Sequence, residues 1–233
     1  MQKVLVYILF LSLGTSLLKA QNHEIGVFLG GSNPIADVGR GAYVYSSKLA
    51  IGGLYKWNLH DRFSLRAQLI KTTLLGNDKQ SDVIGKQMRG FRFENRITEL
   101  MGGFEYNFYP FSMDKLLDRP ITPYLFSGIN YFWYDDLFYD TTFSYKSLQA
   151  VVTSKRRGSF SIPVIAGIKA KVGMRWVIAL EVGTRFTFVN DLDGSFPKDT
   201  TRFSFGNKST YDKYTFAGLT LTYTFGEDPC YCK

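Results

Sequence analysis

The feature of this sequence that most limits its fold is a two-residue alternation of apolar and polar side chains, which recurs eight times after residue 20. In Phe63–Leu69, for example, the odd-numbered residues are apolar, and the even-numbered residues are Ser, Arg and Gln. Successive side chains of a β-strand point to opposite faces, so such runs predict strands with one apolar and one polar face. The predicted strands are Glu24–Leu29, Leu49–Leu59, Phe63–Leu69, Thr98–Phe108, Pro123–Trp133, Phe160–Ala170, Trp176–Phe188 and Thr215–Phe225.

The connections between these runs alternate in length. The long ones are Gly30–Lys48, Thr72–Arg96, Tyr134–Gly158 and Asn190–Tyr214, and the short ones are His60–Arg62, Pro110–Thr122 and Lys171–Arg175. Bacterial outer-membrane barrels have an even number of strands, long external loops and short periplasmic turns. A soluble lipocalin-type barrel has no reason to separate its loop lengths in this way. The pattern therefore predicts an all-β, eight-stranded antiparallel up-and-down transmembrane β-barrel with both termini in the periplasm.

The first twenty residues read as a secretory signal. Lys3 supplies a positive charge, Val4–Leu13 is apolar, and Ala20 is the small residue that a signal peptidase requires. The apolar run is too short to cross a bilayer as a helix, and no later run approaches that length. An exported chain without such a helix is either soluble or a closed barrel. The predicted organisation is a signal peptide over 1–20, an outer-membrane barrel over 21–226 and a periplasmic tail over 227–233.

The polar face of the predicted strands carries equal numbers of acids and bases. An eight-stranded barrel has room inside only for its own side chains, and isolated buried ions carry a large desolvation penalty. We therefore expect these charges to pair in a plugged interior with no conducting pore. The predicted lumenal charge network consists of Glu24, Lys56, Arg66, Glu99, Glu105, Lys169, Glu181 and Arg185.

The net charge of +8 falls to +6 once the two lysines of the signal are removed. Nucleic acid is a poor explanation for this charge in an exported protein. The basic residues fall largely in the long connections, where they could pair with lipopolysaccharide phosphates or could simply be solvated. They are Lys79, Lys86, Arg89, Arg92, Arg96, Lys155, Arg156, Arg157, Lys198, Arg202, Lys208 and Lys213.

The sequence offers little for catalysis or for a cofactor. Barrel hydrolases usually place a His near the external rim, whereas His23 and His60 both fall at the periplasmic end. Asp191–Ser195 has the spacing of a calcium-loop fragment but lacks the distal Glu, so a turn is expected there. Gly30–Pro34 lacks the Lys of a phosphate loop and is expected to be a loop. No enzyme activity, cofactor or metal is predicted.

The only two cysteines are Cys230 and Cys232, two positions apart in the tail. Export permits disulfides, but a bridge between residues so close would be strained. A disulfide to another chain and free thiols therefore both remain open.

Several strings resemble one family of barrels, the PorG-like outer-membrane subunits of the type IX secretion system. The last strand, Gly218–Phe225, also resembles the final-strand signal that is read by the outer-membrane barrel assembly machinery. The family resemblance covers nearly the whole chain after the signal, with Pro34 as a small departure. The strings that carry it are His23–Asn33, Ala36–Gly39, Glu105–Phe108, Thr122–Gly128, Leu180–Thr187, Asp191–Ser195 and the tail with its cysteines.

The resemblance implies a structural role. Such subunits tie a periplasmic ring, made of a lipoprotein and a companion subunit, to the outer membrane, within a machine that exports proteins bearing a C-terminal sorting domain. A general structural or adhesive barrel that works through its outer loops is the alternative, and an outer-membrane lipid enzyme is disfavoured by the histidine positions. The expected docking residues, which could also be ordinary solvated turn residues, are Lys115, Leu116, Leu117, Arg119, Lys171, Arg175, Cys230 and Cys232.

Overall fold

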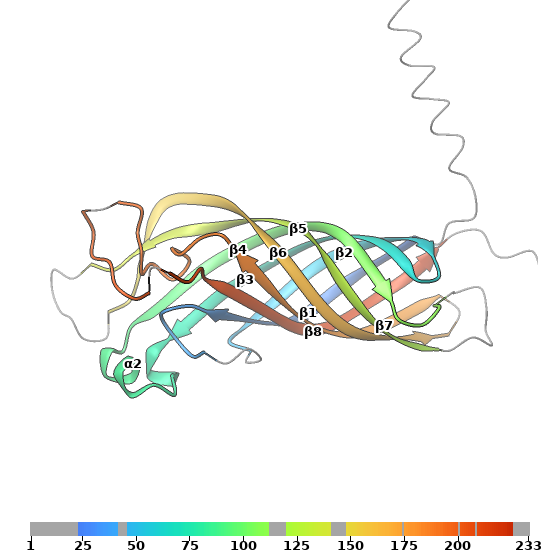
Figure 1. The fold of residues 1–233 in the computed structure, drawn as a ribbon, viewed down its shortest axis with the longest axis horizontal. Coiled ribbons are helices and arrows are strands. Elements are labelled where there is room, and N and C mark those ends of the chain that lie inside the picture. Colours follow the sequence, from blue (N-terminus) through green and yellow to red (C-terminus); the bar gives the residue numbers. More distant parts are fainter. Residues whose placement is uncertain are drawn as a thin grey trace, which may run out of the picture.

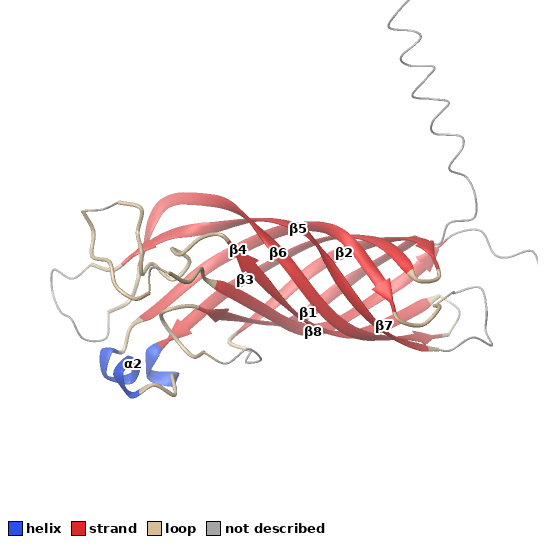
Figure 2. Ribbon diagram, in the orientation of Figure 1, coloured by secondary structure: helices blue, strands red, loops and turns tan. Residues whose placement is uncertain are grey.

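The computed structural model describes residues 23–41, 46–111, 120–140, 148–173, 175–199, 201–207 and 209–225, apart from the side chain of residue 154. These residues form a closed barrel of eight antiparallel strands in which each strand pairs with its sequence neighbours (Figures 1 and 2). This confirms the predicted fold class. The strands are β1 (His23–Ile35), β2 (Lys48–His60), β3 (Phe63–Asn77), β4 (Arg92–Asn107), β5 (Ile121–Phe138), β6 (Val151–Val172), β7 (Trp176–Thr187) and β8 (Lys213–Phe225).

The barrel is closed by the pairing of its first and last strands. β1 and β8 are in register from His23 opposite Phe225 to Ile35 opposite Lys213. Closure leaves no strand edge with unpaired backbone groups. Among the described residues, no helix has the length and apolar character needed to cross a membrane.

The two ends of the barrel differ. The end that carries His23, Phe225 and the connections β2–β3, β4–β5 and β6–β7 is called the turn end below. The opposite end, called the loop end, carries the connections β1–β2, β3–β4, β5–β6 and β7–β8 (Figure 1). The β3–β4 connection there contains a short 3₁₀ helix, η1 (Asp78–Gln80), and the one-and-a-half-turn helix α2 (Ile84–Arg89). The predicted alternation of loop length holds only in part, because the β4–β5 connection (108–120) is no shorter than β1–β2 (36–47) or β5–β6 (139–150).

The strands are longer at the loop end than the sequence pattern predicts. β3 continues to Asn77, β4 begins at Arg92 and β6 begins at Val151. The prediction of a loop at Gly30–Pro34 is wrong, since Gly30 to Pro34 belong to β1 and pair with β8. Beyond the apolar part of the wall, outward side chains become polar, so the alternation disappears although the backbone pairing continues.

An apolar belt surrounds the outside of the barrel. Its side chains are between about 39% and 67% exposed, although they are large and hydrophobic. Such a continuous apolar surface is unfavourable in water and suits contact with lipid. The apolar belt consists of Ile25, Val27, Leu29, Leu49, Ile51, Phe63, Leu69, Leu100, Phe104, Leu125, Ile129, Phe160, Ile162, Val164, Ile168, Trp176, Ile178, Leu180, Val182, Leu219 and Leu221.

Candidate functional site

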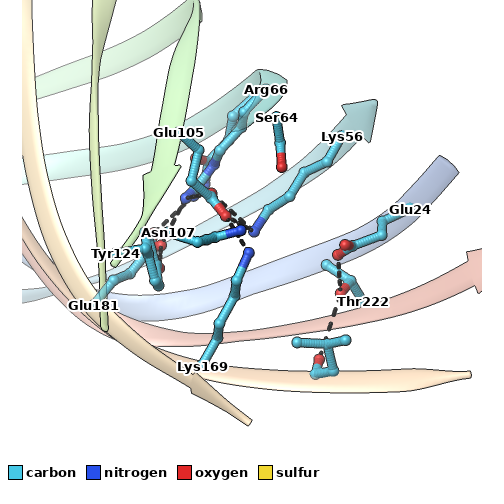
Figure 3. Close-up of polar contacts among 12 residues, drawn as sticks. Glu24, Lys56, Ser64, Arg66, Glu105, Asn107, Tyr124, Lys169, Glu181 and Thr222 are labelled. Atoms are coloured by element: carbon cyan, nitrogen blue, oxygen red, sulfur yellow. Dashed lines mark hydrogen bonds and ion pairs between the residues drawn. The ribbon is translucent and has the colours of Figure 1, made fainter. Parts of the chain in front are cut away.

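The interior near the turn end is organised around the carboxylate of Glu105 on β4. Lys56 of β2 lies 2.9 Å from Oε2, and Lys169 of β6 lies 2.7 Å from Oε1 (Figure 3). Arg66 of β3 approaches Oε2 to 3.5 Å. All four side chains are at most 1% exposed. One buried carboxylate on β4 thus joins the neighbouring strand β3 to two strands that do not pair with β4, namely β2 and β6.

Arg66 connects this group to a second carboxylate, Glu181 of β7. Its two terminal nitrogens donate to the two oxygens of Glu181 at 2.9 and 2.8 Å. The Tyr124 hydroxyl donates to Glu181 at 2.5 Å, and Arg66 also donates to Gln68 at 2.5 Å. Bidentate guanidinium–carboxylate pairs are strong and directional, so they fix strand positions as well as charge.

A second buried pair lies on the same inner wall. Arg185 of β7 donates to Glu99 of β4 through Nη2 at 2.8 Å and through Nε at 3.2 Å. The Tyr214 hydroxyl and the Asn130 amide donate to the other oxygen of Glu99 at 2.8 and 3.1 Å. This carboxylate is therefore saturated by donors from three different strands.

Glu24 is held in a different way from the other predicted members of the network. Its oxygens accept hydrogen bonds from the Asn58 amide at 2.8 Å and from the Thr222 hydroxyl at 2.7 Å. Ser64 in turn donates to Asn58 at 2.7 Å. The structure thus places all eight predicted lumenal charges inside, and polar side chains that the sequence analysis did not single out satisfy several of them.

The loop end of the interior is filled by aromatic rings. Phe91, Tyr139 and Phe205 pack with ring centroids 4.9 to 5.2 Å apart. The Arg89 guanidinium lies 4.9 Å from the ring of Phe91 and 4.8 Å from that of Phe205. Further into the barrel, Phe132 is fully buried in the same hydrophobic cluster. These rings close the interior above the charge network.

Buried aspartates tie the loop-end segments to one another. Asp78 accepts the backbone N–H groups of Gly39 at 2.8 Å and Phe91 at 3.1 Å, and it pairs with Arg89 at 2.7 Å. Asp193 accepts the N–H of Val38 at 3.0 Å. Each carboxylate therefore links stretches of chain that are far apart in the sequence.

Asp193 and a further buried aspartate of the loop end, Asp212, have raised pKa values. Burial raises the pKa of the Asp193 carboxyl above its usual value. Burial also raises the pKa of Asp212, and the nearby charge of Asp193 adds to this shift. Asp212 still accepts the N–H of Leu192 at 3.0 Å. The Asp191–Ser195 stretch is a turn with Gly194 at a φ of +78°, as expected from its composition.

The histidines stand where the sequence analysis placed them, at the turn end. His23 begins β1 and hydrogen-bonds through Nδ1 with the Tyr55 hydroxyl at 2.7 Å, while His60 ends β2. Within the described ranges, no group of three His, Cys, Asp or Glu side chains could hold a metal ion.

The predicted docking residues are only partly described. Lys171 ends near the Phe111 ring, with Nζ 5.2 Å from its centroid, and Arg175 donates to the Tyr223 hydroxyl at 3.0 Å. Both lie at the turn end, on either side of the β6–β7 turn. The remaining predicted docking residues lie outside the described residues, as does the signal peptide: Lys115, Leu116, Leu117, Arg119, Cys230 and Cys232.

A barrel closed in this way should not conduct ions. We expect purified protein in planar bilayers to give no stable channel, because charge pairs occupy the interior near one end and aromatic rings occupy it near the other. Single-channel recording at about 1 M salt would measure this, with a porin as the positive control. A steady conductance of the wild-type protein would contradict a sealed interior.

Comparison with solved structures agrees with this fold. The outer-membrane protein OprG from Pseudomonas aeruginosa is similar, with 11% identity, a TM-score of 0.50, and coverage of 90% of this chain and 98% of that chain. The Yersinia pestis attachment invasion locus protein Ail matches with 11% identity and a TM-score of 0.47 over 89% of this chain and 100% of that chain. The outer membrane protease OmpT from Escherichia coli matches with 10% identity and a TM-score of 0.39 over 90% and 98%.

At such low identities the likeness shows the fold alone, that of small outer-membrane barrels. No curated protein matches the sequence. A family model described as a domain of unknown function matches residues 2–233.

Proposed function

We propose that this chain, which belongs to the DUF6089 family, is a sealed outer-membrane barrel that anchors the periplasmic ring of the type IX secretion system. The observation that supports a structural role is the filled interior. With charge pairs around Glu105 and rings around Phe91 closing the barrel, its two ends and its outer wall are the surfaces left for function.

The turn end suits a periplasmic contact. β1 begins there and β8 ends there, so the chain enters and leaves the barrel at the same end. In outer-membrane barrels the end with the short turns faces the periplasm. Lys171 and Arg175 flank the β6–β7 turn at this end. The identity of the partner, a ring of a lipoprotein and a companion subunit, comes from the resemblance to PorG-like subunits.

Co-purification tests the anchor directly. We expect the affinity-tagged barrel, extracted from native membranes after mild cross-linking, to bring both ring subunits with it. The Lys171→Glu/Arg175→Glu variant should recover roughly tenfold less of them, because reversed charges oppose a complementary surface. Quantitative mass spectrometry of the eluate measures the recovery.

A matched control reverses two exposed lysines at the loop end, Lys79→Glu and Lys198→Glu, and should leave recovery unchanged. A second variant that ends at residue 226 asks whether the tail contributes, and a non-reducing gel asks whether Cys230 or Cys232 links to a partner. If wild-type barrel yields no ring subunit under these conditions, the anchoring role is wrong.

The alternative, an adhesive barrel that works through its loops, rests on the exposed apolar side chains at α2. Val83, Ile84 and Met88 are 57%, 72% and 78% exposed, well away from the apolar belt. An adhesin would lose surface binding when these three residues become Ser and would keep it when the turn end is altered. That pattern, together with absent ring subunits, would favour this second role.

A further inference from the structure

An open recess of about 420 Å³ lies on the outer wall of the barrel, on the loop-end side of the apolar belt. Three cationic side chains line it: Lys71 of β3, Arg96 of β4 and Arg156 of β6. Thr73 and Thr98 also line it and could donate their hydroxyl protons to an anion. The recess is therefore basic and rich in hydrogen-bond donors.

The two arginines are fixed by one buried carboxylate. Asp135 of β5, whose side chain is 2% exposed, accepts Arg96 Nε at 2.7 Å and lies 3.5 Å from Arg156 Nε. Arg156 also donates to the carbonyl oxygens of Arg96 and Trp133, at 3.3 and 3.4 Å. Because Asp135 accepts a hydrogen bond from Arg96 Nε, the Arg96 side chain is held in one orientation. It nevertheless stays 71% exposed.

The charges in this region do not balance. Asp135 offsets one of the three cations, and the next acid along β4, Glu94, already pairs with Arg92 at 2.6 Å. Lys71 stands opposite Thr98 in the β3–β4 register, and Arg96 stands opposite Thr73. Lys71 and Arg96 are thus diagonal neighbours, a relation that places such residues about 7–8 Å apart. A single phosphate group can bridge two cations at that spacing.

The recess borders surface that contacts lipid. Leu69 lies two residues before Lys71 on the same outward face of β3, and Leu49 of β2 lines the recess itself. Leu69, Leu49 and Leu100 are 46%, 65% and 50% exposed. Trp133 stands opposite Thr98 on β5, and tryptophan is typical of the membrane–water interface. The cations therefore sit at the height of lipid headgroups.

We propose that this recess binds the phosphate of a phosphorylated glycolipid of the outer leaflet, with the acyl chains lying on Leu49, Leu69 and Leu100. The choice of the outer leaflet rests on the proposed function, in which the turn end faces the periplasm. The charges and hydroxyl groups of the recess do not depend on that orientation. Continuity with the apolar belt favours a lipid over a soluble anion, and the excess of positive charge favours a phosphorylated headgroup over a neutral one.

Native mass spectrometry of the purified barrel in neutral detergent tests the proposal. The probe is diphosphorylated lipid A, titrated against its dephosphorylated form and against inorganic pyrophosphate. We expect wild-type protein to bind diphosphorylated lipid A at least roughly tenfold more tightly than either comparison probe. The Lys71→Gln/Arg96→Gln variant should bind it roughly thirtyfold more weakly than wild type.

The matched control, Lys79→Gln/Lys198→Gln, removes the same charge from exposed loop positions and should bind like wild type. Lys71→Arg keeps the cation and should retain binding, and Gln at position 96 can still donate to Asp135, which protects the fold. Retained gel mobility of the folded barrel checks each variant. Equal losses in the test and control variants, or equal binding of dephosphorylated lipid or pyrophosphate, would overturn the proposal. None of these outcomes depends on the secretion-system ring.

Discussion

Replacing Glu105 with Gln is expected to lower the free energy of unfolding of the barrel by about 3–5 kcal/mol. Glu105 is the common partner of Lys56, Lys169 and Arg66, all of them buried. The substitution keeps the size of the side chain and removes its charge, so three cations share a low-dielectric interior with less compensation. Removing one partner from a buried ion network leaves uncompensated charge, which is the costly case.

Urea unfolding in detergent micelles, followed by tryptophan fluorescence and by the mobility of the folded barrel on gels, measures this loss. Glu94→Gln is the matched control, because Glu94 pairs with Arg92 on the outer wall and its side chain is 37% exposed. It should cost no more than about 1 kcal/mol. Adding Lys169→Gln to the Glu105 variant should recover part of the loss. Equal stability of the Glu105 and Glu94 variants would contradict the central role of Glu105.

The second large effect is expected at the loop end. Asp78→Ala removes the acceptor of two backbone N–H groups, those of Gly39 and Phe91, and the partner of Arg89. Buried donors left without an acceptor each cost about 1–3 kcal/mol. We therefore expect the loop segments to open locally with a loss of about 3 kcal/mol, while the strands below stay paired.

Hydrogen exchange of the two amides measures this opening and should speed up roughly a hundredfold. Asp82→Ala is the control, because its side chain is 80% exposed and lies 3.6 Å from Arg40. That variant should exchange like wild type. If the Asp78 variant instead lost the whole barrel at once, the loop end and the wall would form a single cooperative unit.

The barrel and the identity of its interior charges could be predicted because the alternation of a strand fixes which face each side chain joins. Arg66, for example, must point inward once Phe63 and Leu69 point outward. Which charges meet could not be predicted, since that depends on strand tilt and on the stagger between neighbouring strands. The hydrogen bonds from Asn58 and Thr222 to Glu24 arise in the same way.

The loop end escaped prediction for a different physical reason. Asp78 and Asp193 act by accepting backbone N–H groups, and a backbone donor has no signature in the sequence. The basic residues Arg96 and Arg156 were assigned to long loops, but they belong to β4 and β6. Their outward faces are polar because they lie beyond the apolar belt, and polar strands resemble loops when only the sequence is read.

The unequal strand lengths have a mechanical consequence. β6 has 22 residues, whereas about 9–11 tilted residues cross a bilayer. At about 3.3 Å per residue and a tilt of about 35–45°, the surplus of about 11–13 residues amounts to roughly 25–35 Å. Most of it extends the paired β5 and β6 beyond the apolar belt at the loop end, since β6 begins at Val151 and its first belt residue is Phe160. A peptide inserted in the β5–β6 connection would thus lie beyond the lipid headgroups, held there by paired strands. An epitope placed there should reach antibody on intact cells even when the sugar layer hides the lipid surface itself.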